Sequence, residues 1–236
     1  MKKIFYAMVL LSVTACFVAA CSDDESNNDG GNTDIEEVVP GTNHKILVAY
    51  FSEPLSDGVD AITSASRVIV DGDLYGSVQY VATVIGEATG GDMVRIQTAQ
   101  PYPGNFDDLA DQADNERQND IHPTLATEID NFDDYDVVFV GYPIWWYQMP
   151  MAMYSFFDKF DCNGKTVIPF STHGGSGWSG TLEDIRELVP NATMVGGYSI
   201  SRNNTATSRS GILNWLREIG NAIVRCCLRG FTRFHY

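Results

Sequence analysis

Two adjacent tryptophans, Trp145 and Trp146, follow shortly after an apolar run at residues 137–140. This run consists of β-branched and aromatic residues, a composition typical of a strand buried on both faces. Pro143 then ends regular strand pairing, because it has no backbone N–H to donate. Large flat side chains just past the carboxyl end of a buried strand lie where open α/β sheets bind flat ligands. Core filling at a strand end is the alternative, and this stretch alone favours neither.

A second stretch that could bind a ligand is a loop of small residues, which follows another apolar run. Its backbone N–H groups can come close to the edge of a ligand, because the side chains are short. His173 titrates near neutrality, so we predict it as the catalytic group that moves a proton, with a solvated loop histidine as the alternative. The predicted binding residues of this loop are Thr172, His173, Gly174, Gly175, Ser176 and Gly177.

The same loop superficially resembles the HGG oxyanion loop of esterases. That chemistry needs a serine within G-x-S-x-G and a histidine later in the chain. No such pentapeptide occurs, and the only later histidine is His235, near the end of the sequence. We therefore expect no hydrolase activity.

Regular alternation of strands and helices positions these loops. This alternation predicts an α/β fold, in which a doubly wound parallel sheet has helices on both faces. Sheets of this kind bind ligands at the carboxyl ends of their strands. A short extra strand at residues 68–70 and Thr181 as a helix N-cap are also expected. The predicted main strands are residues 46–51, 93–96, 137–140, 166–170 and 193–195. The predicted helices are residues 76–88, 105–119, 125–132, 151–160, 181–188 and 208–219.

Composition excludes several classes of function. Of 236 residues, 31 are acidic and 15 are basic, which gives a formal net charge of −16. Such a charge repels phosphate backbones, so no nucleic-acid partner is expected. Outside the first 21 residues the cysteines are Cys162, Cys226 and Cys227, and their spacing is typical of neither a zinc site nor a disulfide framework. No metal is expected.

The amino-terminal segment has the layout of an export signal. Lys2 and Lys3 precede an apolar run, and the sequence Val18-Ala19-Ala20-Cys21 resembles the lipobox of bacterial lipoproteins. That resemblance predicts a signal peptide at residues 1–20 and lipidation of Cys21, hence a membrane anchor in a bacterial cell envelope. Residues 21–43 are polar and acidic and predict a flexible tether. We expect a folded domain at residues 44–220. An atypical basic tail follows at residues 221–236, and it is either an extension of the last helix or an aberrant end.

Four motifs carry a resemblance to a known family: ILVAYFS at the first strand, GSVQYVA at the first helix, GYPIWWYQMP, and PFSTHGGSG. Together they resemble the flavodoxin-like family, in particular its lipoprotein-borne members, over residues 45–219. The resemblance implies a five-stranded sheet of order 2-1-3-4-5, flavin mononucleotide (FMN) as cofactor, and electron transfer or quinone-type reduction. A quinone or another redox partner is then expected outside the cytoplasm.

The resemblance also assigns roles within the loops. Trp145 and Trp146 would form a wall against the isoalloxazine ring, because both surfaces are large, flat and partly polar. Pro143 and Ile144, which precede them, would also bind the cofactor. Ser52, Gly76, Ser77 and Val78 would hold the phosphate, because hydroxyls and N–H groups at a helix N-terminus bind anions.

One departure from the family pattern opens an alternative. Relatives usually have Gly-Asn-Thr where this chain has Gly76-Ser77-Val78, so a hydroxyl is missing. A flavodoxin-shaped lipoprotein that has lost the cofactor and binds another ligand or partner is therefore the second hypothesis. An ordinary helix cap is the alternative for Gly76-Ser77.

Overall fold

The computed structural model describes residues 44–53 and 66–231, with side chains described as far as residue 220. Its main sheet has the order β4-β1-β5-β6-β7, with β8 also pairing with β6, and every pairing is parallel. The strands are β1 (Ile46–Tyr50), β4 (Asp92–Arg95), β5 (Val137–Pro143), β6 (Thr166–His173), β7 (Thr193–Met194) and β8 (Tyr198–Ser201). Counting β7 and β8 as one broken fifth strand, the predicted order 2-1-3-4-5 is confirmed.

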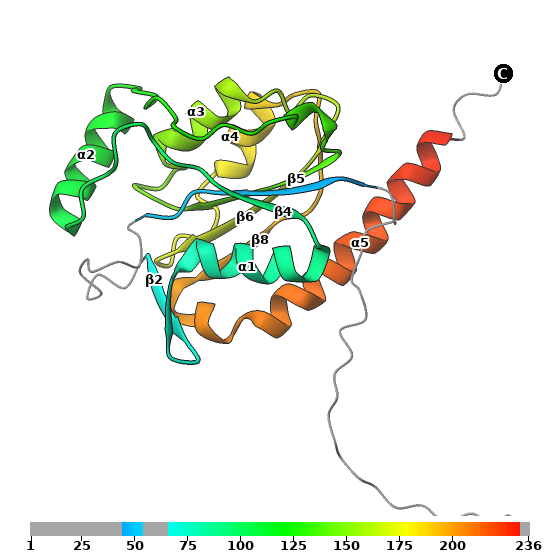
Figure 1. The fold of residues 1–236 in the computed structure, drawn as a ribbon, viewed down its shortest axis with the longest axis horizontal. Helices are drawn as coiled ribbons and strands as arrows, with labels where there is room; N and C mark the ends of the chain where they lie inside the picture. The colour runs from blue at the N-terminus through cyan, green and yellow to red at the C-terminus, as the bar shows by residue number, and fades with distance from the viewer. Residues whose placement is uncertain (1–43, 54–65, 232–236) are drawn as a thin grey trace, which may run out of the picture. The chain divides into compact units, whose positions relative to one another are not determined.

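Helices cover both faces of this sheet (Figure 1). On one face lie α1 (Ser77–Thr89) and α5 (Arg209–Phe231). On the other lie α2 (Phe106–Gln118), α3 (Met151–Lys159) and α4 (Thr181–Leu188). The doubly wound architecture expected from the alternation of strands and helices is therefore present.

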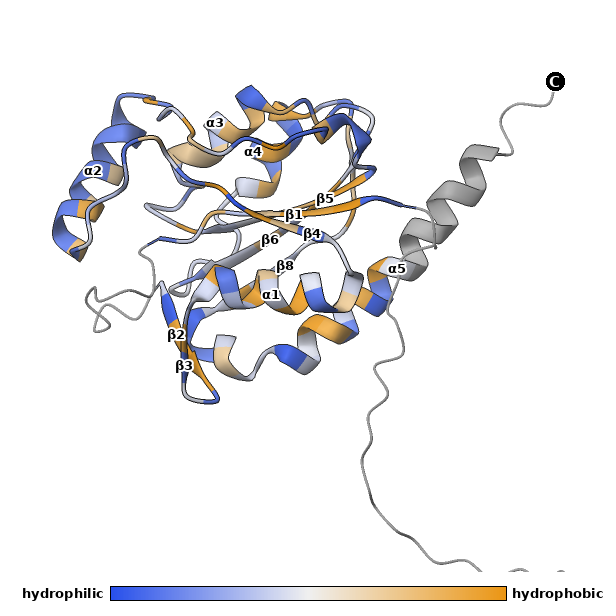
Figure 2. Ribbon diagram, viewed as in Figure 1, coloured by the Kyte–Doolittle hydropathy of each residue, from blue (hydrophilic) through white to orange (hydrophobic). Residues whose placement is uncertain are grey.

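The central strands are apolar throughout because they are buried on both faces. All five residues of β1 and all seven of β5 are buried. Val138 and Val140 of β5 face a core beneath α3 and α4, whereas Val137 and Phe139 face a second core beneath α1 and α5. Figure 2 shows the apolar colouring of these strands between two layers of amphipathic helices.

A two-stranded hairpin precedes α1. Strands β2 (Arg67–Val70) and β3 (Asp73–Gly76) pair antiparallel. Asp71 and Gly72 join them with φ of 53° and 95°, the left-handed conformation that tight hairpin turns require. The extra strand expected at residues 68–70 is confirmed, and β3 is its partner.

Two local predictions are wrong. Residues 125–132 form no helix: Leu125 bridges to Thr98, and the Ala126 N–H donates to the Gln97 carbonyl over 2.8 Å. The alternation of buried and exposed residues there fits an extended chain, and a 3-10 helix, η1 (Phe132–Asp134), follows. The fifth strand predicted to begin at residues 193–195 is present as β7, and β8 pairs with β6 further along the chain. Gly180, with φ of 86°, occupies the cap position of α4, and Thr181 is the first helical residue.

Helix α5 continues through residues 221–231, so the backbone there extends the last helix. The leader, Cys21 and the tether lie outside the described residues. Among the residues that the structure describes, no helix is both long and apolar enough to cross a membrane.

Candidate functional site

The loops that carry the predicted site residues begin at one edge of the sheet. In the parallel register Pro143 of β5 pairs with Thr172 of β6, and His173 pairs with Ser201 of β8. The Ile144 N–H extends this pairing by donating to the Thr172 carbonyl over 2.9 Å. The loops after β5 and β6 therefore leave the sheet side by side, as the fold class predicts.

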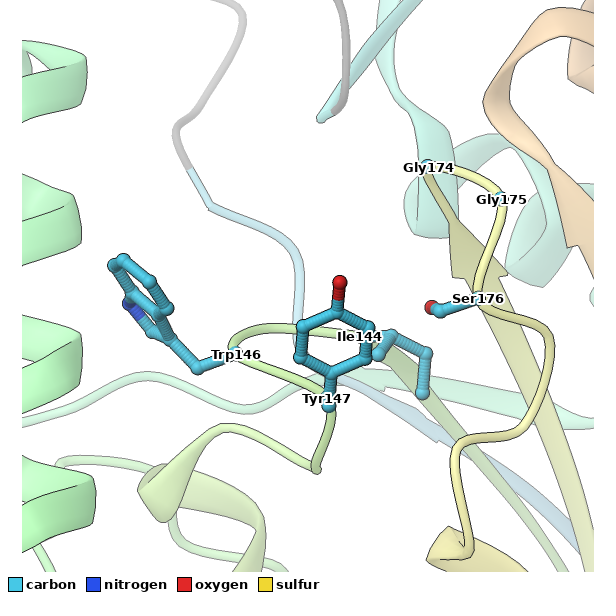
Figure 3. Close-up of a pocket in the computed structure, with 6 residues that line it drawn as sticks. All are labelled: Ile144, Trp146, Tyr147, Gly174, Gly175 and Ser176. Carbon is cyan, nitrogen blue, oxygen red and sulfur yellow. The ribbon is translucent and has the colours of Figure 1, made fainter.

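A pocket of about 450 Å³ lies between these two loops. This volume falls within the range of small-molecule sites. Figure 3 shows one wall formed by the loop after β5 and the opposite wall by the glycine loop after β6. The lining residues are Ile144, Trp146, Tyr147, Gly174, Gly175 and Ser176.

The wall from the β5 loop is a tight turn made of two aromatic residues. Trp145 and Gln148 exchange backbone hydrogen bonds of 3.0 and 2.9 Å, and Trp146 and Tyr147 lie between them. Their φ values are 47° and 63°, in the left-handed region that bulky residues rarely adopt. The Tyr147 side chain is 76% exposed and stands between Trp146 and Ser176. Strained backbone of this kind clusters at ligand sites.

The two tryptophans of the predicted wall have different surroundings. Trp145 makes edge-to-face contacts with Phe51 and Tyr102, at ring-centroid distances of 5.3 and 5.6 Å. Its ring therefore belongs to the edge of the core. Trp146 borders the pocket, and its indole Nε1–H donates to the Ala110 carbonyl of α2 over 3.1 Å.

Sequence reasoning missed Tyr147, although it continues the same aromatic run. Its exposure depends on the two-residue left-handed turn, and turns of that type are usually recognised by Asn or Gly. The run Trp145-Trp146-Tyr147 contains neither, so the only available signal was the length of the aromatic run itself.

The opposite wall leaves room for a ligand. A Cβ placed on Gly174 would meet no protein atom within 4 Å, and Gly174 itself borders the pocket. Gly175 and Gly177 have φ of 137° and 62°, so glycine at these positions permits the turn. The space that a side chain at Gly174 would occupy is thus open to a ligand.

His173 lies at the start of this loop. Burial lowers the pKa of its imidazole below the ordinary value of 6.5. Its Nδ1 accepts the Gly175 N–H over 3.0 Å, so the neutral ring carries its proton on Nε2. At neutral pH His173 is therefore a neutral side chain that can donate a hydrogen bond from Nε2.

The predicted phosphate residues also come together. A Cβ on Gly76 would lie 2.1 Å from the Ser52 Oγ, so only glycine allows the loop after β1 to approach the start of α1 this closely. Arg95 of β4 holds that loop in place: its Nη2 donates to the Ser52 carbonyl over 3.0 Å and pairs with the Glu53 carboxylate.

The start of α1 offers fewer free donors than the family pattern implies. The Gly76 N–H donates to the Gln79 side chain over 3.0 Å, and the Ser77 N–H donates to the Ser66 carbonyl over 2.7 Å. Val78 is 2% exposed and packs in the core beneath α1 and α5. Val78 therefore packs in the core, and its side chain supplies no hydrogen-bond donor to a phosphate.

Two buried hydroxyls mark this edge of the sheet. Ser77 and Thr172 are 0% and 1% exposed, and neither side-chain oxygen has a hydrogen-bond partner among the residues that the structure describes. A buried hydroxyl without a partner is destabilising, so native proteins usually satisfy it through a ligand or water. Both oxygens fit a polar ligand bound at this edge.

Comparisons with known proteins agree with this geometry. The model of a family described as Flavodoxin matches residues 69–219, more than half of the chain. No curated protein matches.

Solved structures share the fold. A protein of Bacteroides eggerthii DSM 20697, described as a candidate flavoprotein, is 29% identical with a TM-score of 0.57, over 74% of this chain and 96% of that one. A similarly described protein of Bacteroides uniformis ATCC 8492 is 26% identical with a TM-score of 0.57, over 75% and 99%. A flavoprotein of Lactobacillus acidophilus NCFM in complex with FMN is 14% identical with a TM-score of 0.50, over 71% and 99%, and this likeness concerns the fold alone. The chain belongs to the flavodoxin family.

Proposed function

We propose that this protein binds FMN at the carboxyl edge of its sheet and transfers electrons as a lipid-anchored protein of a bacterial cell envelope. The observation that carries the proposal is the open pocket between the aromatic turn after β5 and the glycine loop after β6. Bound FMN would supply reversible electron transfer, a chemistry that amino-acid side chains lack. Its electron donor or acceptor would be a quinone or another redox partner.

The ring end of the site fits a flat heteroaromatic group. Tyr147 offers an exposed aromatic surface, and Gly174 leaves the facing side of the slot open. Aromatic rings in offset contact contribute about 0.5–1.5 kcal/mol beyond their buried area. Backbone N–H groups of the glycine loop and Nε2–H of His173 can donate to polar atoms at the edge of such a ring.

The phosphate end fits in part. The hydroxyls of Ser52 and Ser77 lie at the start of α1, where the helix dipole favours an anion. Two of the first N–H groups already have protein partners, as described above. We therefore expect the phosphate to add less to the affinity than the ring does.

Absorption titration of the purified chain with FMN and with riboflavin tests the proposal. We expect saturable binding of both flavins, with the phosphorylated form bound more tightly. Equal affinities would remove Ser52 and Ser77 from the site and keep the aromatic wall. No binding of either flavin would contradict the proposal. It would favour a flavodoxin-shaped lipoprotein that binds another ligand or partner. The core position of Val78 and the occupied N–H groups are compatible with that alternative.

The anchor needs a separate test. Metabolic labelling with a clickable fatty-acid analogue should mark the protein, and Cys21→Ser should abolish the label. A labelled Cys21→Ser variant would contradict lipidation at this cysteine.

In the proposed cycle His173 moves a proton. At neutral pH its ring is neutral, so it would first take up a proton from water at Nδ1, which releases the Gly175 N–H, and the imidazolium would then give up the proton on Nε2. His173→Gln keeps a hydrogen-bonding side chain but removes the titration. We expect slower flavin reduction in this variant with little change in flavin affinity. An unchanged rate would leave His173 a solvated loop residue.

A further inference from the structure

The aromatic turn after β5 needs support from outside itself. Trp146 and Tyr147 both have positive φ, and each left-handed bulky residue is unfavourable relative to ordinary backbone. Two hydrogen bonds between Trp145 and Gln148 close the turn. Such a conformation persists only where neighbouring contacts stabilise it.

Two contacts on opposite sides of the turn provide that support. On the core side, Trp145 packs against Phe51 and Tyr102. On the outer side, the Trp146 indole reaches α2, where Nε1–H donates to the Ala110 carbonyl. In Figure 3 the Trp146 ring points away from the glycine loop, whereas the Tyr147 ring stands in the slot.

Helix α2 is fixed near the same turn. Of its residues, Leu109, Ala113 and Glu116 are buried, and the rest of the helix is largely polar. The buried Glu116 carboxylate accepts the Tyr102 hydroxyl over 2.6 Å. Because Tyr102 also packs against Trp145, α2 contacts the turn region at two points, through Tyr102 and through Trp146.

We propose that Trp146 is a positioning residue, whose indole N–H couples the aromatic turn to α2 and so holds Tyr147 in the pocket. The inference deepens the proposed flavin site on which it rests. It assigns different roles to neighbouring aromatic residues: Trp145 packs in the core edge, Trp146 anchors the turn, and Tyr147 faces the ligand. It also makes α2, which contributes no lining residue, part of the site.

Trp146→Phe tests the coupling, because it keeps an aromatic ring and removes the indole N–H together with the second ring of the indole. Trp215→Phe is the matched control, since the Trp215 Nε1–H also donates to a backbone carbonyl, that of Gly196, over 3.0 Å. Trp215 lies in the core beneath α5, away from the turn. Both variants are made in the full-length chain, purified in mild detergent.

Two measurements are needed, one of them independent of any ligand. Hydrogen exchange of residues 145–149 in the flavin-free protein should be on the order of fivefold faster in Trp146→Phe than in the wild type, matching the loss of one hydrogen bond. The dissociation constants of FMN and riboflavin should rise together by a similar factor, because the isoalloxazine ring is common to both. Trp215→Phe should change neither.

The outcomes separate this inference from the proposed function. Unchanged exchange at residues 145–149 in Trp146→Phe would overturn the coupling even if the protein binds flavin. Faster exchange with unchanged flavin affinity would also overturn it, because the turn would then not serve the pocket. Faster exchange in a protein that binds no flavin in its wild-type form would support the coupling and contradict the proposed function.

Discussion

Replacing Tyr147 with glycine should make the protein more stable and weaken the proposed flavin site. Tyr147 has φ of 63°, and the left-handed conformation costs an L-residue about 1–2 kcal/mol. Glycine removes that cost but loses about 0.5–1 kcal/mol through the greater entropy of its unfolded chain. The ring is 76% exposed, so its removal loses little packing. At the middle of both ranges the net gain is roughly 0.75 kcal/mol.

Tyr147→Ala is the control, because it removes the same ring and retains the Cβ that makes positive φ unfavourable. Urea unfolding followed by circular dichroism should rank Tyr147→Gly above Tyr147→Ala. The melting temperature of Tyr147→Gly should be about 1–4 °C above that of Tyr147→Ala, because 1 kcal/mol shifts the melting temperature of a domain of this size by about 2–4 °C.

Both variants should bind FMN more weakly than the wild type. The loss of one aromatic contact of about 0.5–1.5 kcal/mol corresponds to a factor of roughly two to twelve. A glycine variant that is no more stable than the alanine variant would contradict this prediction, and so would FMN binding by either variant that is as tight as in the wild type.

Three further predictions concern the rest of the site. Gly174→Ala should weaken FMN binding roughly tenfold by filling the slot, whereas Gly196→Ala, whose added Cβ also meets no protein atom within 4 Å, should leave affinity unchanged in the same titration. Gly76→Ala should displace the Ser52 hydroxyl and lower affinity for FMN more than for riboflavin; an equal loss for both would contradict the phosphate assignment. His173 has a pKa lowered by burial, so its contribution to stability is present above about pH 6.5 and is lost as the pH falls through the lower folded value. In His173→Gln the melting temperature should therefore fall less between about pH 8 and about pH 5 than in the wild type. An unchanged pH dependence would contradict this effect of His173 on stability.

The parts of the fold predicted best are those in which burial on both faces leaves a continuous apolar run. Residues 46–51 and 137–140 read as central strands, because polar residues at either face would be buried without partners. Once these strands are placed in an alternating α/β order, the edge that carries the ligand follows from topology. The pocket between the loops after β5 and β6 lies at that edge.

Only the first strand of the hairpin, β2, could be predicted from the sequence, and the reason is local. Residues 68–70 are β-branched, whereas β3 (Asp73–Gly76) has the sequence DLYG with little strand propensity. Pairing with β2 holds β3 in place, and the available signal was Asp71-Gly72, a favoured hairpin turn.

The roles of individual aromatic side chains could not be predicted, because they depend on tertiary contacts. Trp145 and Tyr147 are both large and flat, and residue type favours each equally as a ligand wall. Only the packing of Trp145 against Phe51 and the left-handed turn at Tyr147 separate them. Similarly, Val78 belongs to the core beneath α1 and α5, a position that depends on how α1 packs on the sheet and not on residue type alone.

Hydrogen exchange tests most directly whether FMN occupies the slot between the loops after β5 and β6, as we propose. A second cavity of about 380 Å³ lies at the opposite end of these strands and is lined by residues including Asp133 and Lys165, so it is an internal control. Hydrogen exchange with and without saturating FMN distinguishes the two places in one measurement. We expect protection at residues 144–149 and 172–177, and none at 133–137 or 163–166. Protection confined to the second cavity, or no protection anywhere, would contradict the proposal.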